Sequence, residues 1–211
     1  MIGMFSALYI VSSSIVSFVT QVGYPEHFLR GILMTAVVLW TGRKWSATIM
    51  GAVCGLVFLL VVPSPAPYLL ASTFVSGLVF DLVLTPGSFA KSIRSTTRVL
   101  IGAAVSGAAE SLVALSILTY AGFFGTKTLA ILGIAWSTDL VLNIILSAVG
   151  AIIAIQFLSK KLKTMYDSVK PSITEYSFAY ESKTISVAIV AGLILIACIA
   201  SIVQFILFVW R

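Results

Sequence analysis

Long apolar runs separated by short polar breaks dominate this sequence. A helix needs about 20 apolar residues to cross the hydrocarbon core of a bilayer, which is roughly 30 Å thick. Seven runs approach that length, and we expect each to form a membrane-spanning helix. They lie at residues 1–20, 25–41, 46–63, 67–84, 97–122, 128–158 and 184–210. The pattern therefore predicts an all-α integral membrane protein.

Proline marks several of the breaks. Pro25 suits the first turn of the second helix, because backbone N–H groups in a first turn have no partner within the helix and the N–H that proline lacks is not needed there. Pro63, Pro65 and Pro67 predict a tight turn between the third and fourth runs, because proline disrupts the interior of a helix. Residues 85–87, which read Thr-Pro-Gly, predict the end of the fourth helix.

Composition excludes several classes of protein. Of the 211 residues, 60% are hydrophobic and only 9% are charged, whereas a soluble domain carries about 25% charged residues. A soluble globular domain, a disordered chain, a collagen and a disulfide scaffold are all excluded. Cys54 and Cys198 lie in apolar runs and His27 is the single histidine, so we expect no disulfide, no metal site and no cofactor.

The basic residues predict the orientation. If the N-terminus is cytoplasmic, ten of the 13 Lys and Arg residues fall on the inside, and only Arg30, Lys127 and Arg211 fall outside. This asymmetry follows the positive-inside rule and accounts for the basic character of the chain without a nucleic-acid partner. We therefore expect a multi-pass protein of the cell membrane, surrounded by lipid.

One polar segment, 159–183, interrupts the apolar pattern near the C-terminus. Lys160, Lys161 and Lys163 mark the cytoplasmic end of the sixth helix. The chain accordingly divides into a six-helix transmembrane body at 1–163, a cytoplasmic linker at 164–183 and an additional transmembrane helix at 184–211.

Two acidic residues lie at similar depth on consecutive helices. Glu110 comes about 12 residues before the outer turn between the fifth and sixth spans, and Asp139 about 12 residues after it. An acid at the bilayer centre costs about 2.5–3.5 kcal/mol, so it usually faces a cavity or a partner. No basic residue is expected at this depth. The pair either lines a pocket for a cationic ligand or forms a hydrogen-bonded structural pair with one acid neutral.

The sixth span adds candidates on one helical face. Trp136, Asp139 and Asn143 are spaced i, i+3 and i+7. An indole, a carboxylate and an amide together suit a flat cationic or amine-bearing ligand, and Ser106 lies one turn before Glu110. The alternative is that the tryptophan is an interfacial residue and the asparagine joins helices.

Other polar residues favour structural or peripheral roles. We expect Asp81 to form a salt bridge with nearby basic residues or to serve in docking. Glu26 and Arg30 are spaced i, i+4 at the outer start of the second helix and are expected to pair at the rim. With Tyr24 and His27 they are candidates for an outer lid.

The chain resembles the substrate-binding S component of an energy-coupling factor (ECF) vitamin transporter over residues 1–163. The opening MFSALYIV at 4–11, the segment SGLVFD at 76–81, and NIILSAVGAIIAIQFLSKK at 143–161 carry the resemblance. Gly3 and Ala7 are in register with a small-xxx-small motif that in the family contacts the coupling protein. Small residues at this spacing let helices approach closely.

The resemblance implies a six-helix body with both ends inside and a pocket that opens outward. It implies docking on a membrane coupling protein with two ATPase subunits. The protein itself is not expected to be an enzyme, because it has no glycine-rich nucleotide loop and no catalytic motif. Thiamine or its pyrimidine precursor is the ligand that the resemblance and the candidate residues suggest. The seventh helix departs from the family pattern.

Two further interpretations remain open. In one, Glu110 and Asp139 are proton sites of a proton-coupled small-solute carrier. In the other, the chain is a non-transporting membrane subunit whose polar residues bind neighbouring helices. An intramembrane enzyme is the least favoured class.

Overall fold

The computed structural model describes residues 1–20, 24–61, 67–122 and 129–168, and every regular element in these ranges is a helix. The elements are α1 (Ile2–Thr20), α2 (Tyr24–Thr41), α3 (Ser46–Val61), α4 (Pro67–Leu84), the short α5 (Phe89–Ser92), α6 (Thr96–Tyr120) and α7 (Leu129–Ser168). The all-α prediction is confirmed for the described residues. The seventh predicted helix, 184–210, lies outside them.

The predicted boundaries of the first six runs agree closely with the helices. Each observed end lies within two residues of its prediction, except the end of α7. Pro67 begins α4, as expected for proline in a first turn. After α4, Gly87 adopts a φ of +80°, a conformation that side chains disfavour, so the Thr-Pro-Gly break does end the helix.

Helix α7 is longer than predicted. It continues past residue 158 to Ser168, so residues 164–168, assigned to the linker, are helical. The physical reason is local. Lysine, leucine and methionine between residues 159 and 168 favour helix, and the next proline along the chain is Pro171. Hydropathy marks where the apolar segment ends, which need not be where the helix ends.

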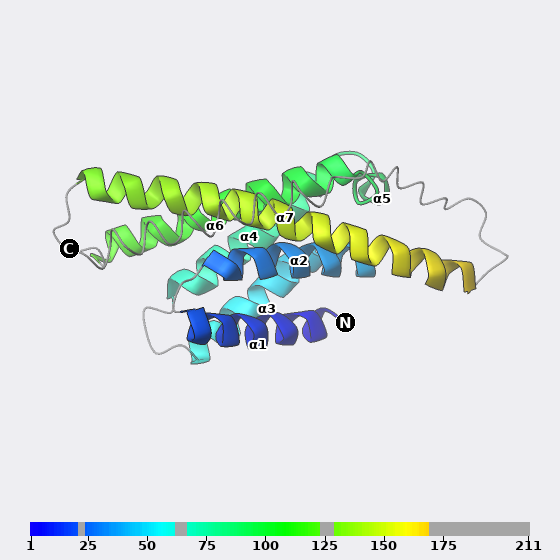
Figure 1. Cartoon of the computed structure of the whole chain (residues 1–211), viewed down its shortest axis with the longest axis horizontal. Helices are drawn as coiled ribbons and strands as arrows, with labels where there is room; N and C mark the ends of the chain where they lie inside the picture. Colours follow the sequence, from blue (N-terminus) through cyan, green and yellow to red (C-terminus); the bar gives the residue numbers. More distant parts are fainter. Residues whose placement is uncertain (21–23, 62–66, 123–128, 169–211) are drawn as a thin grey trace.

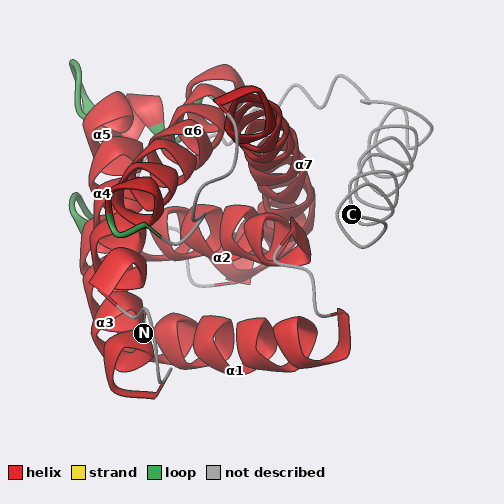
Figure 2. Ribbon diagram, turned by 90° about the vertical axis from the view of Figure 1, so that its left-hand side faces the viewer, coloured by secondary structure: helices red, strands yellow, loops and turns green. Residues whose placement is uncertain are grey.

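Five long helices pack in a ring, and a sixth lies against its side. Going round the ring, α2 contacts α7, α7 contacts α6, α6 contacts α4, α4 contacts α3, and α3 contacts α2, while α1 packs on α2 and α3 (Figure 2). The N-terminus, α5 and the end of α7 lie at the same end of the bundle (Figure 1). The end of α6 and the start of α7 lie at the other end (Figure 1).

Glycines set the closest helix contacts. A Cβ atom on Gly31 of α2 would lie 2.3 Å from the carbonyl oxygen of Ser147 in α7, and one on Gly150 would lie 2.4 Å from the carbonyl oxygen of Phe28. Gly51 of α3 faces the Thr73 carbonyl of α4 in the same way. Backbones can approach this closely only where no side chain intervenes, so α2 and α7 are held face to face.

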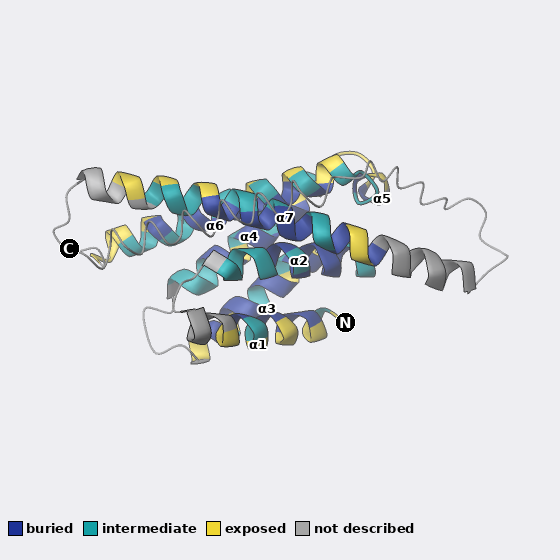
Figure 3. Ribbon diagram, viewed as in Figure 1, coloured by how far each residue is buried: buried dark blue, intermediate teal, exposed yellow. Residues whose placement is uncertain are grey.

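Several polar side chains are buried inside the bundle, and many large apolar side chains are exposed on its outer faces. Leu60 is 84% exposed and Phe157 is 76% exposed, while Arg30, Asp81 and Asn143 are fully buried; Figure 3 shows the exposed positions along the outer faces. Two helical segments, Thr96–Tyr120 and Trp136–Leu158, are long and apolar enough to cross a membrane by length and composition.

Asp81 has a different partner from the one predicted. Its Oδ2 atom accepts hydrogen bonds from the Thr48 backbone N–H and hydroxyl, both at 2.7 Å, at the N-terminus of α3. Arg98 instead donates to the Pro86 carbonyl and the Ser92 hydroxyl. The expected salt bridge with the basic residues is therefore wrong. The acid caps a neighbouring helix, whose N-terminal N–H groups attract negative charge.

Replacing Asp81 by alanine should destabilise the fold by about 1–2 kcal/mol, because the partly buried Thr48 N–H loses its acceptor. Asp81→Asn keeps a carbonyl acceptor for the Thr48 N–H group, so its loss of stability should be clearly smaller than that of Asp81→Ala. The measurement is the free energy of unfolding in detergent micelles, followed by helical circular dichroism. Equal losses for the two variants would show that charge, and not the cap, matters there.

Candidate functional site

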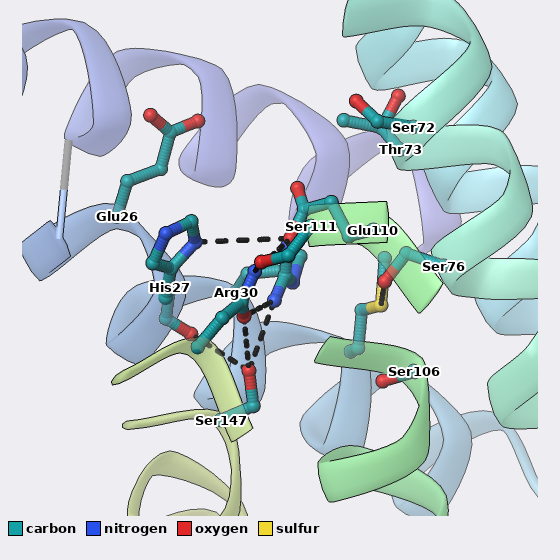
Figure 4. Close-up of polar contacts among 12 residues, drawn as sticks. Glu26, His27, Arg30, Ser72, Thr73, Ser76, Ser106, Glu110, Ser111 and Ser147 are labelled. Carbon is teal, nitrogen blue, oxygen red and sulfur yellow. Dashed lines mark hydrogen bonds and ion pairs between the residues drawn. The ribbon is translucent and has the colours of Figure 1, made fainter. Parts of the chain in front are cut away.

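The guanidinium of Arg30 is the centre of a buried polar cluster. Arg30 lies in α2 and is only 1% exposed. Its Nη1 atom forms an ion pair with Glu110 Oε2 of α6, and its Nη2 atom donates to Asn143 and, at 2.9 Å, to Ser147 of α7 (Figure 4). A charge buried away from water is tolerated when it is paired and hydrogen-bonded in this way. Three helices therefore meet at one side chain.

Asn143 connects the members of this cluster. Its Nδ2 group donates to Glu110 Oε2 at 3.1 Å and to the Ser111 hydroxyl at 2.8 Å. Its Oδ1 atom accepts from Arg30 and from the Ser147 hydroxyl, the latter at 3.1 Å. An amide has two donor hydrogens and two acceptor lone pairs, and all are used here. Asn143 is thus committed to bonds within the protein.

His27 lies beside the ion pair, between two acids. Its Nδ1 atom is 3.7 Å from Glu110 Oε2, and its Nε2 atom is 3.6 Å from Asp139 Oδ1. These separations are longer than hydrogen bonds but within the range of ion pairs. Both acids therefore lie within 4 Å of the same imidazole of α2, and a shared ligand pocket stays a prediction.

The cluster has a closed end and a more open end. The side chain of Arg30 is 1% exposed and Asn143 is fully buried. By contrast, the side chain of His27 is 16% exposed and that of Asp139 is 24% exposed. A ligand arriving from outside the bundle would therefore meet the His27 and Asp139 end first.

The expected position of Arg30 is wrong. The sequence suggested an exposed rim residue paired with Glu26, and no basic group at the depth of Glu110. Instead, Arg30 pairs with Glu110, and Glu26 accepts a hydrogen bond from the Tyr9 hydroxyl at 3.1 Å. The reason is tertiary, because the close approach of α2 to α7 turns the Arg30 face of α2 into the bundle.

Other predicted residues have different environments. Ser106 is buried, donates to the Ala103 carbonyl of its own helix and lies apart from the Arg30 cluster (Figure 4). Trp136 is half-buried, one turn before Asp139. The side chain of Tyr24 lies outside the described part of the structure. The lid proposed for Tyr24, Glu26, His27 and Arg30 stays a prediction, although Arg30 has the buried position given above.

The α1 pair is exposed. Gly3 and Ala7 lie on the outer face of α1, and nothing lies within 4 Å of a Cβ atom added to Gly3. Met4 and Leu8 are exposed beside them. The pair does not serve packing within the described chain, unlike Gly51 and Gly55 of α3, which pack against α4. Contact with a coupling protein stays a prediction.

Sequence reasoning missed Ser111 and Ser147. Each hydroxyl completes the hydrogen bonds of Asn143, and the Ser147 hydroxyl also accepts a hydrogen bond from Arg30. Their positions offered a signal, since Ser111 follows Glu110 directly and Ser147 is four residues after Asn143, on the same helical face. Small hydroxyl residues are common in apolar helices, however, so the signal was weak.

Among the described residues, no group of three or more His, Cys, Asp or Glu side chains could hold a metal ion. No protein-family model, no curated protein and no solved structure matches the chain. Functional inference therefore rests on the cluster itself.

Proposed function

We propose that this chain is the membrane-embedded substrate-binding subunit of an ECF-type, ATP-driven vitamin importer. Its ligand is a small cationic or amine-bearing aromatic molecule such as thiamine or its pyrimidine precursor. The observation that carries the proposal is the partly exposed Asp139 carboxylate at the open end of the polar cluster, one helical turn from Trp136.

A membrane location is supported by the distribution of side chains. Large apolar groups are exposed on the outer faces of the helices, while Arg30, Glu110 and Asn143 are buried between the helices, which suits a lipid solvent and not water. The hydropathy of α6 and α7 agrees with this. We propose a multi-pass protein of the cell membrane with a cytoplasmic N-terminus, at the end of the bundle where the exposed Arg43, Lys44 and Lys91 also occur.

The charges divide the predicted ligand residues into two groups. Glu110 is paired with Arg30, and Asn143 is fully hydrogen-bonded, so these two hold the base of the site together. Asp139 contacts the imidazole of His27 and remains partly exposed. A cationic ring stacked on the Trp136 indole would therefore place its charge toward Asp139.

Coupling to ATP would require partner proteins. The chain lacks a glycine-rich nucleotide loop, so hydrolysis belongs to two ATPase subunits acting through a coupling protein. The exposed Gly3 and Ala7 of α1 support this arrangement, because small residues on an outer face allow another helix to approach closely.

Thiamine should quench the tryptophan fluorescence of the purified protein in a saturable way. Asp139→Asn is expected to weaken binding by about 10- to 100-fold, since a charge-assisted contact contributes about 1.5–3 kcal/mol. Trp136→Phe should remove most of the quenching and weaken binding less. The measurement is a fluorescence titration, repeated by calorimetry for the variants.

Two variants serve as controls. Trp45→Phe changes an exposed tryptophan just before α3. Ser137→Ala changes an exposed hydroxyl residue of α7, two positions before Asp139 in the sequence. Both should bind as the unaltered protein does. If neither thiamine, its pyrimidine nor other small vitamins bind, and the protein co-purifies with a complex, the non-transporting subunit becomes the better interpretation.

A second candidate is a proton-coupled carrier. It is favoured by one observation, the placement of His27 between Glu110 and Asp139. Uptake of thiamine into proteoliposomes that contain this chain alone, driven by a proton gradient without ATP, would support the carrier. Uptake only with ATPase subunits and ATP would support the importer.

A further inference from the structure

Positive charge collects at one end of the bundle, the end that holds the N-terminus and α5 (Figure 1). Where the structure describes side chains, every lysine and arginine other than Arg30 lies there. We call this group the basic face, and its members are Arg43, Lys44, Lys91, Arg94 and Arg98. The acid described at this end, Asp81, is fully buried and bonded to α3. No exposed acid in the described part of the chain therefore offsets the basic face.

Hydrogen bonds place the two halves of the basic face on either side of the end of α4. Asp81 accepts from the Thr48 N–H group at 2.7 Å, so the basic turn before α3 lies beside the last turn of α4. On the other side, Arg98 of α6 donates to the Pro86 carbonyl at 2.9 Å and to the Ser92 hydroxyl at 2.7 Å. The positive-inside rule asks for basic residues near helix ends but not for this grouping around one helix.

An exposed indole lies at the edge of the basic face. Trp45 directly follows Arg43 and Lys44 and is 43% exposed. Its φ is +68°, a conformation that bulky side chains rarely adopt and that occurs often at functional sites. Tryptophan side chains prefer the level of the lipid headgroups. An indole held in this turn therefore places the two neighbouring cations at the level of lipid phosphates.

Exposed apolar side chains continue from the basic face along the outside of the bundle. Ile49 lies one turn after Trp45 in α3, and Ile101 lies three residues after Arg98 in α6. Leu82 is exposed in the last turn of α4, which packs between these two helices. Cations at the helix ends with apolar groups one turn deeper match the phosphate and the acyl chains of one phospholipid.

We propose that the basic face binds the headgroup of an anionic phospholipid such as phosphatidylglycerol. The exposed Arg43, Lys44 and Lys91 attract the lipid phosphate, and the acyl chains lie along the exposed residues of α3, α4 and α6. Basic groups at a membrane surface favour anionic over zwitterionic lipids in this way. The proposal rests on the membrane location proposed above and is independent of the transported ligand.

Lipids with brominated acyl chains test the proposal, because bromine quenches the fluorescence of a nearby indole. The full chain is reconstituted into vesicles that contain a minor fraction of brominated phosphatidylglycerol or of brominated phosphatidylcholine. The anionic lipid should quench as though it bound about tenfold more tightly than the zwitterionic one. High salt should reduce this preference, because it screens exposed charges.

Three variants locate the site. Changing Arg43→Gln and Lys44→Gln together should lower the preference for phosphatidylglycerol to about twofold or less, and adding Lys91→Gln should remove the rest. These side chains are exposed, so the helical circular dichroism should not change. Trp45→Phe should remove the excess quenching. Lys127→Gln is the charge-matched control, since it removes one positive charge between α6 and α7 and should keep the preference.

The remaining outcomes are decisive as well. Equal quenching by the two lipids overturns the proposal and leaves the basic face to an acidic protein partner. A preference that persists in the glutamine variants overturns it too, because the lipid then binds elsewhere. Loss of the preference in millimolar inorganic phosphate would show a site for free phosphate and not for a lipid. A lipid preference in a protein that binds no vitamin supports the lipid site and removes the proposed function.

Discussion

Replacing Arg30 by methionine is expected to destabilise the folded protein by about 3–5 kcal/mol, because Glu110 is left buried without its positive partner. Asn143 and Ser147 lose a donor at the same time. The free energy of unfolding can be measured by titrating the protein in mild detergent with SDS, with helical circular dichroism as the signal. Binding to the Asp139 end should be weakened as well, because α2, α6 and α7 lose their common contact.

Two companion variants make this prediction specific. Arg43→Met removes an exposed arginine just after α2 and should change stability by less than about 0.5 kcal/mol. Adding Glu110→Gln to Arg30→Met removes the uncompensated charge and should recover much of the loss. If Arg30→Met cost no more than Arg43→Met, the ion pair would not be what stabilises this part of the bundle.

The second large effect is expected at the glycines between α2 and α7. In Gly150→Ala the new methyl group would lie 2.4 Å from the Phe28 carbonyl oxygen and 2.8 Å from the Ile32 nitrogen. Both neighbours are backbone atoms, so a helix must move and not merely a side chain. We expect the free energy of unfolding to fall by about 3 kcal/mol or more, which is at the upper end of the losses that overpacked substitutions cause. The same SDS titration measures it.

Gly133→Ala is the matched control on the same helix. Nothing lies within 4 Å of a Cβ atom at Gly133, and alanine favours helix over glycine by up to about 1 kcal/mol. This variant should therefore be neutral or slightly more stable. A similar loss at Gly133 and Gly150 would contradict close helix contact as the cause. Gly31→Ala, which meets the Ser147 carbonyl, should behave like Gly150→Ala.

These two effects concern the same feature of the molecule. Gly31 directly follows Arg30, and Gly150 lies three residues after Ser147. The glycines let α2 and α7 come together, and the guanidinium then reaches Asn143 and Glu110. Separation of the two helices should therefore weaken the polar cluster even when its own residues are unchanged.

The placement of Glu110 and Asp139 illustrates how far the sequence goes toward the site. Counting residues from the α6–α7 connection predicts a common depth for the two acids, and both do contact His27. Counting along a helix does not predict which face of another helix will oppose it. Arg30 was therefore assigned to the outer rim, although its guanidinium lies in the same cluster.

Asp81 shows the same limit. Its nearest basic residues in the sequence suggested a salt bridge, because sequence distance was the available measure. Packing of α4 on α3 brings it instead to the Thr48 N–H group, 33 residues away along the chain. A helix terminus carries no side-chain charge, so a search for charged partners does not detect it.

The sequence by itself determined the six long helices α1–α4, α6 and α7, except for the end of α7, because apolar length and proline placement are local properties that act on each segment separately. It also determined that polar groups in such segments must find partners, since burial without a partner is costly. Only the tertiary structure decided which partners they find. That choice depends on the glycine contacts between α2 and α7, which orient Arg30 and His27 toward the acids of α6 and α7.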